Sequence, residues 1–154
     1  MLRPFVDAYP VDFLYGIFSA DGCAGVCTDH GYLRLRIILG NSDPELLGLV
    51  SSLLQSRFQI HSNTYLKKRK GATWKNGSKT VALRKDAYAL QIQRDHDVRV
   101  FVDKIGFVIA RKQHVAEQAI LLNRNRGSSR AAVEWRKHYS QKKRGRWHNF
   151  GPSE

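Results

Sequence analysis

One acidic residue, Asp21, stands at the end of an apolar stretch and directly before a glycine. The stretch covers residues 14–22 and has the composition of a helix that is at least partly buried. A carboxylate at the end of such a helix offers hard oxygen ligands of the kind that magnesium prefers. A divalent metal held there would activate water and neutralise the charge that develops in phosphodiester hydrolysis. The alternative is a purely local role, because Asp-Gly pairs are common where a helix turns into a loop.

The nine residues of this stretch resemble the motif of the LAGLIDADG homing endonucleases. They match its first leucine, its first glycine and its closing Ala-Asp-Gly, which is five of nine positions. The first acid of the motif is Ser19 in this chain, and the second acid, where the family holds metal, is kept as Asp21. Residues 104–107 and 111–113 are similar to the later part of the family's domain. The resemblance therefore covers residues 10–123.

This resemblance implies a fold and a reaction. The fold is α+β, with an αββαββα core whose curved, four-stranded antiparallel sheet lies along DNA in each subunit. The reaction is hydrolysis of both strands of a long, pseudo-palindromic double-stranded DNA site, with Mg²⁺ or Mn²⁺ as cofactor. The resemblance places the metal on the Asp21 carboxylate and the Ala20 main-chain carbonyl. A lysine near the start of the helix after the second hairpin assists the water network in the family, and the resemblance implies Lys112 or Arg111 for that role. The alternative for either residue is a phosphate contact or a solvated place at the helix start.

A homodimer is implied because the chain holds one copy of the motif, and the family packs two motif helices across the dimer axis. Gly16 and Ala20 are four residues apart and therefore share one face of the expected helix. Phe13 and Ile17 lie beside them, and small residues let two helices approach closely. We expect these four residues to form the dimer interface. The alternative is that Gly16 packs against the core of its own subunit.

The chain is strongly basic, and its charge is unevenly distributed. It has 154 residues and a formal net charge of +13. Residues 1–60 hold four Lys and Arg against six Asp and Glu, whereas residues 61–99 hold ten against three. Segregated charge fits a surface that follows a phosphate backbone. The residues predicted to bind DNA lie on the polar face of an early strand and in a basic second hairpin: Tyr32, Arg34, Arg36, Tyr65, Lys67, Arg69, Lys70, Lys75, Lys79, Arg84 and Lys85.

The spacing of apolar residues predicts the elements that carry these side chains. Asp12 is the expected N-cap of the motif helix, and Gly22 is expected to end it in the left-handed conformation. Residues 32–39 alternate as a strand with one apolar and one cationic face. The further elements expected are a helix that begins at residues 42–45, hairpin arms over 61–70 and 79–93, a helix capped by Asp95 and closed by Gly106, and a helix over 111–122.

Two parts of unequal length are predicted, an endonuclease domain over residues 1–123 and a basic C-terminal extension over residues 124–154. Ala132, Trp135 and Tyr139 indicate a short helix in the extension. We expect the extension to contact DNA beside the core site. The alternative is a poorly ordered tail, which terminal charge runs often form.

The sequence thus predicts an intron- or intein-type homing endonuclease that acts as a metal-dependent homodimer. A protein that binds without cutting is the alternative, either a maturase for intron RNA or a DNA-binding regulator, because its charge map would be the same. A basic ribosome-associated protein would explain the charge but not the motif. The apolar runs are much shorter than the ~20 residues of a membrane-spanning helix, and no signal segment opens the chain. We therefore expect no membrane partner and an intracellular location, in a prokaryotic cytoplasm or an organelle matrix.

Overall fold

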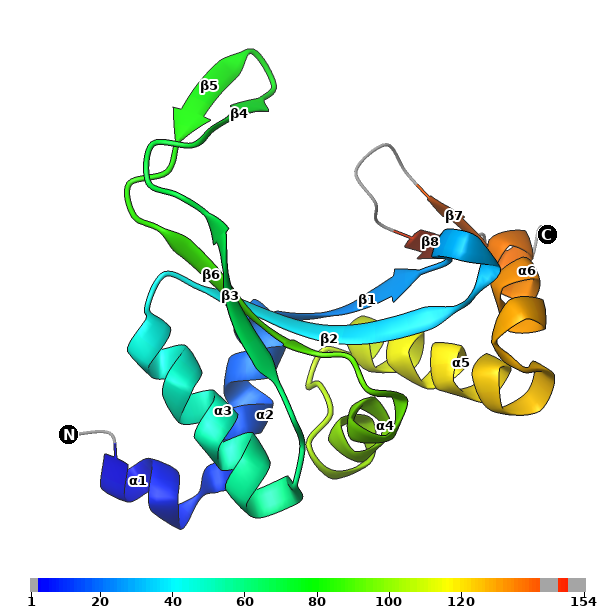
Figure 1. Cartoon of the computed structure of the whole chain (residues 1–154), viewed down its shortest axis with the longest axis horizontal. Coiled ribbons are helices and arrows are strands. Elements are labelled where there is room, and N and C mark those ends of the chain that lie inside the picture. Colours follow the sequence, from blue (N-terminus) through cyan, green and yellow to red (C-terminus); the bar gives the residue numbers. More distant parts are fainter. Residues whose placement is uncertain (1–2, 142–146, 150–154) are drawn as a thin grey trace.

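The computed structural model describes residues 3–141 and 147–149. Helices cover one face of a four-stranded sheet and leave its other face open (Figure 1). No helix of the described part is long and apolar enough to cross a membrane. The elements in chain order are α1 (Arg3–Ala8), α2 (Pro10–Asp21), β1 (Gly22–Cys27), η1 (Asp29–Gly31), β2 (Arg34–Asn41), α3 (Pro44–Phe58), β3 (Asn63–Lys68), β4 (Thr73–Asn76), β5 (Lys79–Ala82), β6 (Ala87–Ile92), α4 (Asp95–Lys104), α5 (Ala110–Arg126), α6 (Ser128–His138), β7 (Tyr139–Gln141) and β8 (Trp147–Asn149).

The strand order of the main sheet is β1-β2-β6-β3, and each neighbouring pair is antiparallel. A separate ladder of β4 and β5 extends the second hairpin, and β7 pairs with β8. The predicted α+β class is confirmed, and the elements from α2 to α4 give the predicted αββαββα order. The β4–β5 ladder, α1 and the elements after α4 are additions to that core.

Strand β2 shows how the sequence builds the two faces of the sheet. Leu35, Ile37 and Leu39 are buried in the core, whereas Arg34 is exposed and Arg36 is half-buried. Successive side chains of a strand point to opposite faces, so the apolar residues pack on the helices and the arginines point to the open face. The alternation predicted for this strand is confirmed.

The motif helix α2 departs from the expectation at both ends. It begins at Pro10, and its N-cap is Tyr9, which makes no side-chain hydrogen bond. The prediction of Asp12 as N-cap is therefore wrong; Asp12 lies in the first turn, where an acid interacts favourably with the helix dipole. Gly22 follows the helix end as predicted, but its φ of −82° and ψ of 160° are extended and not left-handed.

Gly22 is needed for a steric reason. A Cβ at this position would lie 2.4 Å from the main-chain oxygen of Phe18, so the helix end and β1 would have to move apart. We expect Gly22→Ala to lower the free energy of unfolding by about 1–3 kcal/mol, the usual effect of overpacking. Thermal unfolding measures this, with Gly48→Ala as the control, since a Cβ at Gly48 would meet nothing within 4 Å and Gly48 lies outside the proposed dimer contact. A Gly22→Ala protein as stable as the wild type would contradict the steric explanation.

Helices α3 and α4 begin differently. In α3, the Asp43 carboxylate accepts hydrogen bonds from two main-chain N–H groups of the first turn, at 2.9 and 3.2 Å, so the helix start predicted at residues 42–45 is confirmed. In α4, the prediction of Asp95 as the cap is wrong. Arg94 is the N-cap, and Asp95 belongs to the first turn. Gly106 follows α4 with a φ of 69°, which agrees with its predicted role in closing the helix.

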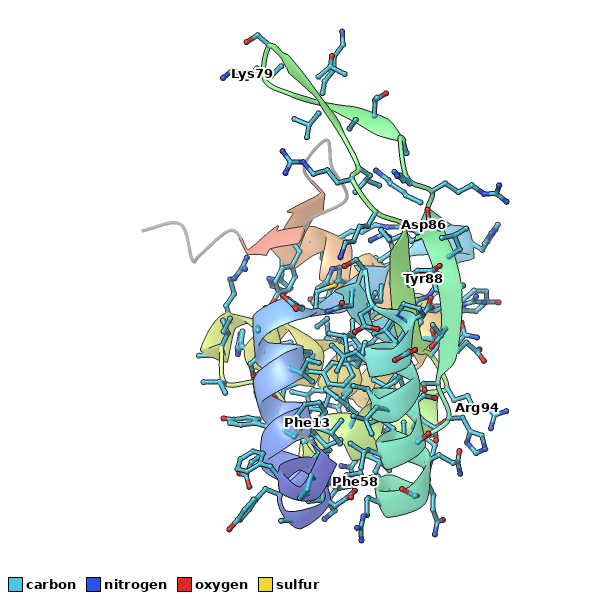
Figure 2. The ribbon with its side chains drawn as sticks, turned by 90° about the vertical axis from the view of Figure 1, so that its left-hand side faces the viewer. Phe13, Phe58, Lys79, Asp86, Tyr88 and Arg94 are labelled. Carbon is cyan, nitrogen blue, oxygen red and sulfur yellow. The ribbon has the colours of Figure 1, made fainter. Side chains whose placement is uncertain are left out.

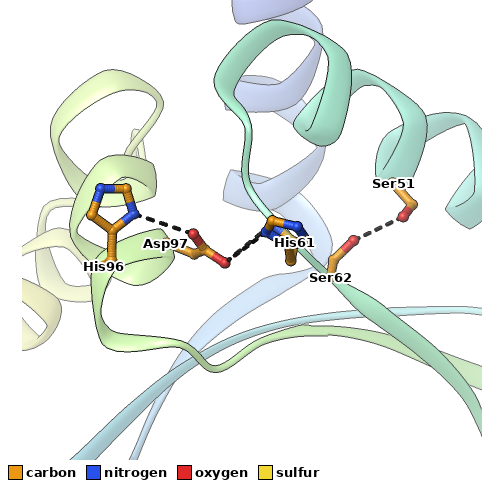
Figure 3. Close-up of polar contacts among 5 residues, drawn as sticks. All are labelled: Ser51, His61, Ser62, His96 and Asp97. Carbon is orange, nitrogen blue, oxygen red and sulfur yellow. Dashed lines mark hydrogen bonds and ion pairs between the residues drawn. The ribbon is translucent and has the colours of Figure 1, made fainter.

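A buried carboxylate ties the start of β3 to α4. Asp97 is 4% exposed, and its Oδ2 accepts a hydrogen bond from the main-chain N of His61 at 3.1 Å. The imidazoles of His61 and His96 lie 3.5 and 3.3 Å from its two oxygens (Figure 3). Beside them, the hydroxyls of Ser51 and Ser62 are 2.9 Å apart. These contacts fix the chain where it enters β3 and so help to position the residues of that strand.

The C-terminal helices share the core of the rest of the chain. The boundary expected between residues 123 and 124 falls inside α5. Ala132 and Trp135, on the short helix now seen as α6, are fully buried in the same hydrophobic cluster. The ring of Tyr139 stacks on Trp135 with centroids 3.9 Å apart, and burial raises the pKa of the Tyr139 phenol. Most of the basic run expected to flank DNA, residues 142–146, lies outside the described residues.

The same helices hold the turn between β1 and β2. The guanidinium of Arg136 donates to the main-chain oxygen of Thr28 at 2.6 Å and to its hydroxyl at 3.1 Å. The side chains of Ser128 and Asn123 donate to the main-chain oxygen of Leu33 at 3.0 and 3.2 Å. The turn at this end of the sheet is therefore fixed by residues about a hundred positions later in the chain.

Candidate functional site

Asp21 is the last residue of α2, and it is exposed. Among the described residues, its carboxylate has no hydrogen-bond or ion-pair partner. An acid at the C-terminal end of a helix is unfavourable by roughly 0.3–1 kcal/mol, because the helix dipole is negative there. Both the carboxylate and the helix end would therefore stabilise a cation at this point.

Lys112 reaches the same helix end from the first turn of α5. Its Nζ donates to the main-chain oxygen of Ser19 at 2.6 Å and to that of Ala20 at 3.4 Å. Arg111, the other basic residue considered for this place, is exposed. The structure therefore brings Lys112 to the Ala20 carbonyl, although 92 positions separate these two residues in the sequence.

Two further side chains hold this arrangement together, and sequence reasoning gave them no role. Ser19, at the place of the first motif acid, is buried, and its hydroxyl accepts a hydrogen bond from the main-chain N of Val108 at 2.7 Å. Gln113 accepts a hydrogen bond from the main-chain N of Phe107 at 3.0 Å. The loop before α5 is thus fixed against the end of α2, which lets Lys112 reach it. The only signal in the sequence was the family likeness of residues 111–113.

The open face of the sheet carries cationic side chains between small ones. In the pairing of β1 with β2, Arg34 lies opposite Cys27, and Arg36 lies opposite Gly25. The side chain of Ile38 lies against Gly25, 3.3 Å from where a Cβ at that position would be. Tyr32, just before β2, is also exposed. The residues predicted in this part of the chain therefore lie together along the end of the open face.

The other predicted DNA-binding residues lie on and beyond the second hairpin. The hairpin continues past the sheet as the β4–β5 ladder, which projects away from the body of the molecule (Figure 1). Tyr65 lies on β3, and its side chain is exposed. The basic side chains of this region are all exposed: Lys67, Arg69, Lys70, Lys75, Lys79, Arg84 and Lys85.

A family model described as the LAGLIDADG-like domain matches residues 8–106. The chain belongs to this family. The match includes all of α2 and the four strands of the main sheet, and it confirms the resemblance inferred from the motif.

One relative and two solved structures are similar to this LAGLIDADG-like chain. An uncharacterised protein of Methanocaldococcus jannaschii is 34% identical over 107 residues, which are 70% of this chain and 36% of that protein. The chain thus spans about a third of the length of this relative. A crystal structure of the homing endonuclease I-CvuI in complex with the I-CreI target is 14% identical, covers 84% of this chain and 77% of that one, and has a TM-score of 0.52. A DNA complex of the archaeal intron-encoded homing endonuclease I-Vdi141I is 13% identical over 88% of this chain and 87% of that one, with a TM-score of 0.47.

The motif helix of this LAGLIDADG-like domain leaves part of one face uncovered. The structure places the four residues of the predicted dimer interface there, with Phe13 and Ile17 half-buried and Gly16 and Ala20 exposed. The alternative in which Gly16 packs against its own core is wrong, because Gly16 is exposed and a Cβ built on it would meet no other part of the fold within 4 Å. Tyr9, just before the helix, is also exposed, by 53%.

The open face of the LAGLIDADG-like domain also holds a row of carboxamides that sequence reasoning missed. Asn63 of β3 lies opposite Gln91 of β6, which lies opposite Ile38 of β2. The amide nitrogen of Gln91 donates to the side-chain oxygen of Gln93 at 3.3 Å. Carboxamides match the donor and acceptor pattern of adenine in the major groove. They are absent from the predicted DNA-binding residues because they carry no charge.

Proposed function

We propose that the chain is a site-specific endonuclease of the homing type, which binds a long double-stranded DNA site as a homodimer and hydrolyses both strands. The observation that carries this proposal is the Asp21 carboxylate at the end of α2, which has no partner among the described residues and lies next to an open, basic sheet face. The ammonium of Lys112 contacts the main-chain carbonyls of the same helix end. Membership of the LAGLIDADG-like family supports it, as does the fold shared with I-CvuI, a homing endonuclease solved with DNA.

The groups at the end of α2 fit Mg²⁺ or Mn²⁺. Both metals favour hard oxygen ligands, and Asp21 offers an exposed carboxylate without a partner in the described part of the chain. The Ala20 oxygen is 3.4 Å from the Lys112 ammonium, and the Ser19 oxygen is 2.6 Å from it. The Ala20 carbonyl therefore makes the weaker hydrogen bond of the two and is the more available to a metal. We assign the metal to Asp21 and Ala20. When bound there, it supplies an activated water and neutralises developing phosphate charge.

A second copy of the chain is part of the proposal. The described residues contain no group of three or more His, Cys, Asp or Glu that could hold a metal ion. Packing the uncovered face of α2 against the same face of another copy would bring two Asp21 carboxylates together. The residues proposed for this contact are Phe13, Gly16, Ile17 and Ala20.

In the proposed complex, the open face of the sheet lies in the major groove, where arginines and carboxamides contact base edges. Arg34 and Arg36 face guanine, and the carboxamides of Asn63 and Gln91 face adenine. The exposed lysines of the second hairpin bind phosphates, which fix the protein on the duplex but carry no sequence information. Lys112 holds the end of α2 through the Ser19 carbonyl and orders water beside the reacting phosphate.

A nucleic-acid-binding protein that does not cut, such as an intron RNA maturase or a DNA-binding regulator, is the second candidate. The Lys112 ammonium already lies at the negative end of α2, and this favours that candidate. A resident cation satisfies the helix end and repels a metal. The two candidates differ in whether a divalent metal converts binding into cleavage.

Metal exchange on a selected target separates the two candidates. The protein would first select duplexes from a randomised DNA library in Ca²⁺, and the enriched sequence would be placed in a plasmid. We expect linear plasmid in Mg²⁺, a gel shift without cutting in Ca²⁺, and no cutting after chelation with EDTA. A shift in both metals without cutting would support the second candidate. Failure to enrich any duplex would refute the proposal.

A further inference from the structure

A joint divides the second hairpin into two ladders. The β3–β6 ladder ends at the pair Lys68 and Ala87, after a register shift in β3. The β4–β5 ladder, which we call the arm, covers residues 73–82. Residues 69–72 and 83–86, which we call the joint, belong to neither ladder. The direction of the arm relative to the sheet therefore depends on the contacts within the joint.

Hydrogen bonds from main-chain N–H groups cross the joint. On the arm side, Gly71 N donates to the oxygen of Leu83 at 2.9 Å, and Leu83 N donates to the oxygen of Ala72 at 3.0 Å. On the sheet side, the Lys70 N–H donates to the Asp86 carboxylate at 2.5 Å. Figure 2 shows Asp86 at the neck from which the arm rises towards Lys79. A side chain thus makes the cross-joint contact nearest to the sheet.

Asp86 is an acidic residue within a strongly basic stretch of the chain. It is the one acidic residue between positions 62 and 94, a stretch that holds nine Lys and Arg. A carboxylate on a cationic surface weakens the attraction of that surface for a polyanion. The favourable contribution of Asp86 therefore lies in its hydrogen bond, which holds the two sides of the joint together.

We propose that Asp86 is a positioning residue, which directs the arm along duplex DNA beyond the base pairs that the main sheet covers. This inference rests on the proposed function, because its ligand is the same DNA. Lys75 and Lys79 on the arm, with Arg84 and Lys85 at the joint, then lie along the flanking phosphates. An arm of about five residues spans ~17 Å at ~3.3 Å per residue. This corresponds to about five base pairs at ~3.4 Å each.

Three variants separate the hydrogen bond from the charge. Asp86→Asn keeps an oxygen acceptor and removes the charge, Asp86→Glu keeps the charge and moves the acceptor, and Asp86→Ala removes both. Hydroxyl-radical footprints and the salt dependence of binding would be measured in Ca²⁺ on the duplex selected by the wild type. We expect Asp86→Ala to lose about five base pairs of protection at each end of the footprint. Its salt slope should fall by about 4 to 7, because the two arms of the dimer together lose about four to eight phosphate contacts and each contact accounts for about 0.9.

Rescue by the conservative variant decides between the two effects of Asp86. We expect Asp86→Asn to keep the full footprint and salt slope, and Asp86→Glu to fall between Asn and Ala. If Asn and Ala give the same short footprint, or if all variants keep the full one, the inference is overturned. Amide hydrogen exchange on free protein gives a second measurement that needs no DNA. Exchange at Lys70 and along the arm should rise in Asp86→Ala and stay unchanged in Asp86→Asn.

The exchange measurement also separates failure of this inference from failure of the proposed function. If the wild type enriches no duplex, the proposed function fails, and the DNA contact of the arm fails with it. The hydrogen-exchange data would still show whether the Asp86 carboxylate stabilises the joint, because this measurement needs no DNA. If the wild type binds DNA but exchange at the arm is the same in all variants, only the inference about Asp86 is overturned.

Discussion

We expect the Asp21→Asn protein to bind the selected DNA target within a few-fold of the wild type in Ca²⁺ and to give no detectable linear plasmid in Mg²⁺. The reason is that asparagine has the size of aspartate but carries no charge, and proteins usually bind Mg²⁺ through carboxylates. The fold should not suffer, since Asp21 is exposed and without a partner in the described structure. Removing an acid from a helix C-terminus even favours the fold by roughly 0.3–1 kcal/mol. Plasmid cleavage, gel shift and thermal unfolding measure the three quantities.

Asp12→Asn is the matched control, because it removes an exposed acid from the other end of the same helix. We expect this variant to cut at nearly the wild-type rate and to unfold at a slightly lower temperature, since the acid there favours the helix dipole. Cleavage retained by Asp21→Asn would overturn the assignment of Asp21. Equal loss of cleavage in both variants would show that the effect comes from the helix and not from a metal ligand.

Most of the core could be predicted from the sequence because it depends on local patterns. In β2, the alternation of Leu35 and Ile37 with Arg34 and Arg36 fixes which face is buried, whatever the neighbouring strand is. In α3, proline at the first helical position and the Asp43 cap mark the start within four residues. Such signals lie inside a single element, so no long-range contact is needed to interpret them.

The wrong predictions concern positions where two different local roles favour the same type of residue. Acids are favourable both as N-caps and in the first helical turn, so composition does not distinguish these two positions. Asp12 was predicted as the N-cap, and it lies in the first turn. Asp95 was misplaced for the same reason. Gly22 ends its helix as predicted, but the cause is the nearby Phe18 carbonyl and not a left-handed backbone. A sequence pattern shows that glycine is needed there and does not show which contact requires it.

The candidate site was predicted in part. The motif singles out Asp21, and composition singles out the basic hairpin, but neither shows which residues meet across long stretches of chain. Ser19 contacts the loop at Val108, and the acidic residue Asp86 accepts a hydrogen bond across the joint of the basic second hairpin. Tertiary contacts of this kind decide the function of single side chains and leave no periodic signal.

The choice between Lys112 and Arg111 is such a case, and it leads to the second large expected effect. We expect Lys112→Met to lower cleavage in Mg²⁺ by about 100-fold, the usual loss when one preorganised charged or hydrogen-bonding group is removed from an active site. The ammonium lies at 2.6 Å from the Ser19 oxygen and 3.4 Å from the Ala20 oxygen, beside the proposed metal ligand Asp21. Initial rates of plasmid linearisation on the selected target measure the effect.

A purely structural role for Lys112 predicts a different result. A cation that only caps α2 contributes about 0.3–1 kcal/mol to stability, so its loss would lower the unfolding temperature and leave cleavage well below that temperature almost unchanged. Arg111→Met is the matched control, since it removes the same charge from the neighbouring, exposed position of α5. Cleavage within threefold of wild type in Lys112→Met, measured while the protein is fully folded, would assign Lys112 to the helix end alone. A 100-fold loss in Lys112→Met against a few-fold loss in Arg111→Met would place the ammonium in the reaction, because both variants lose one charge and only one of them loses the contact with Ala20.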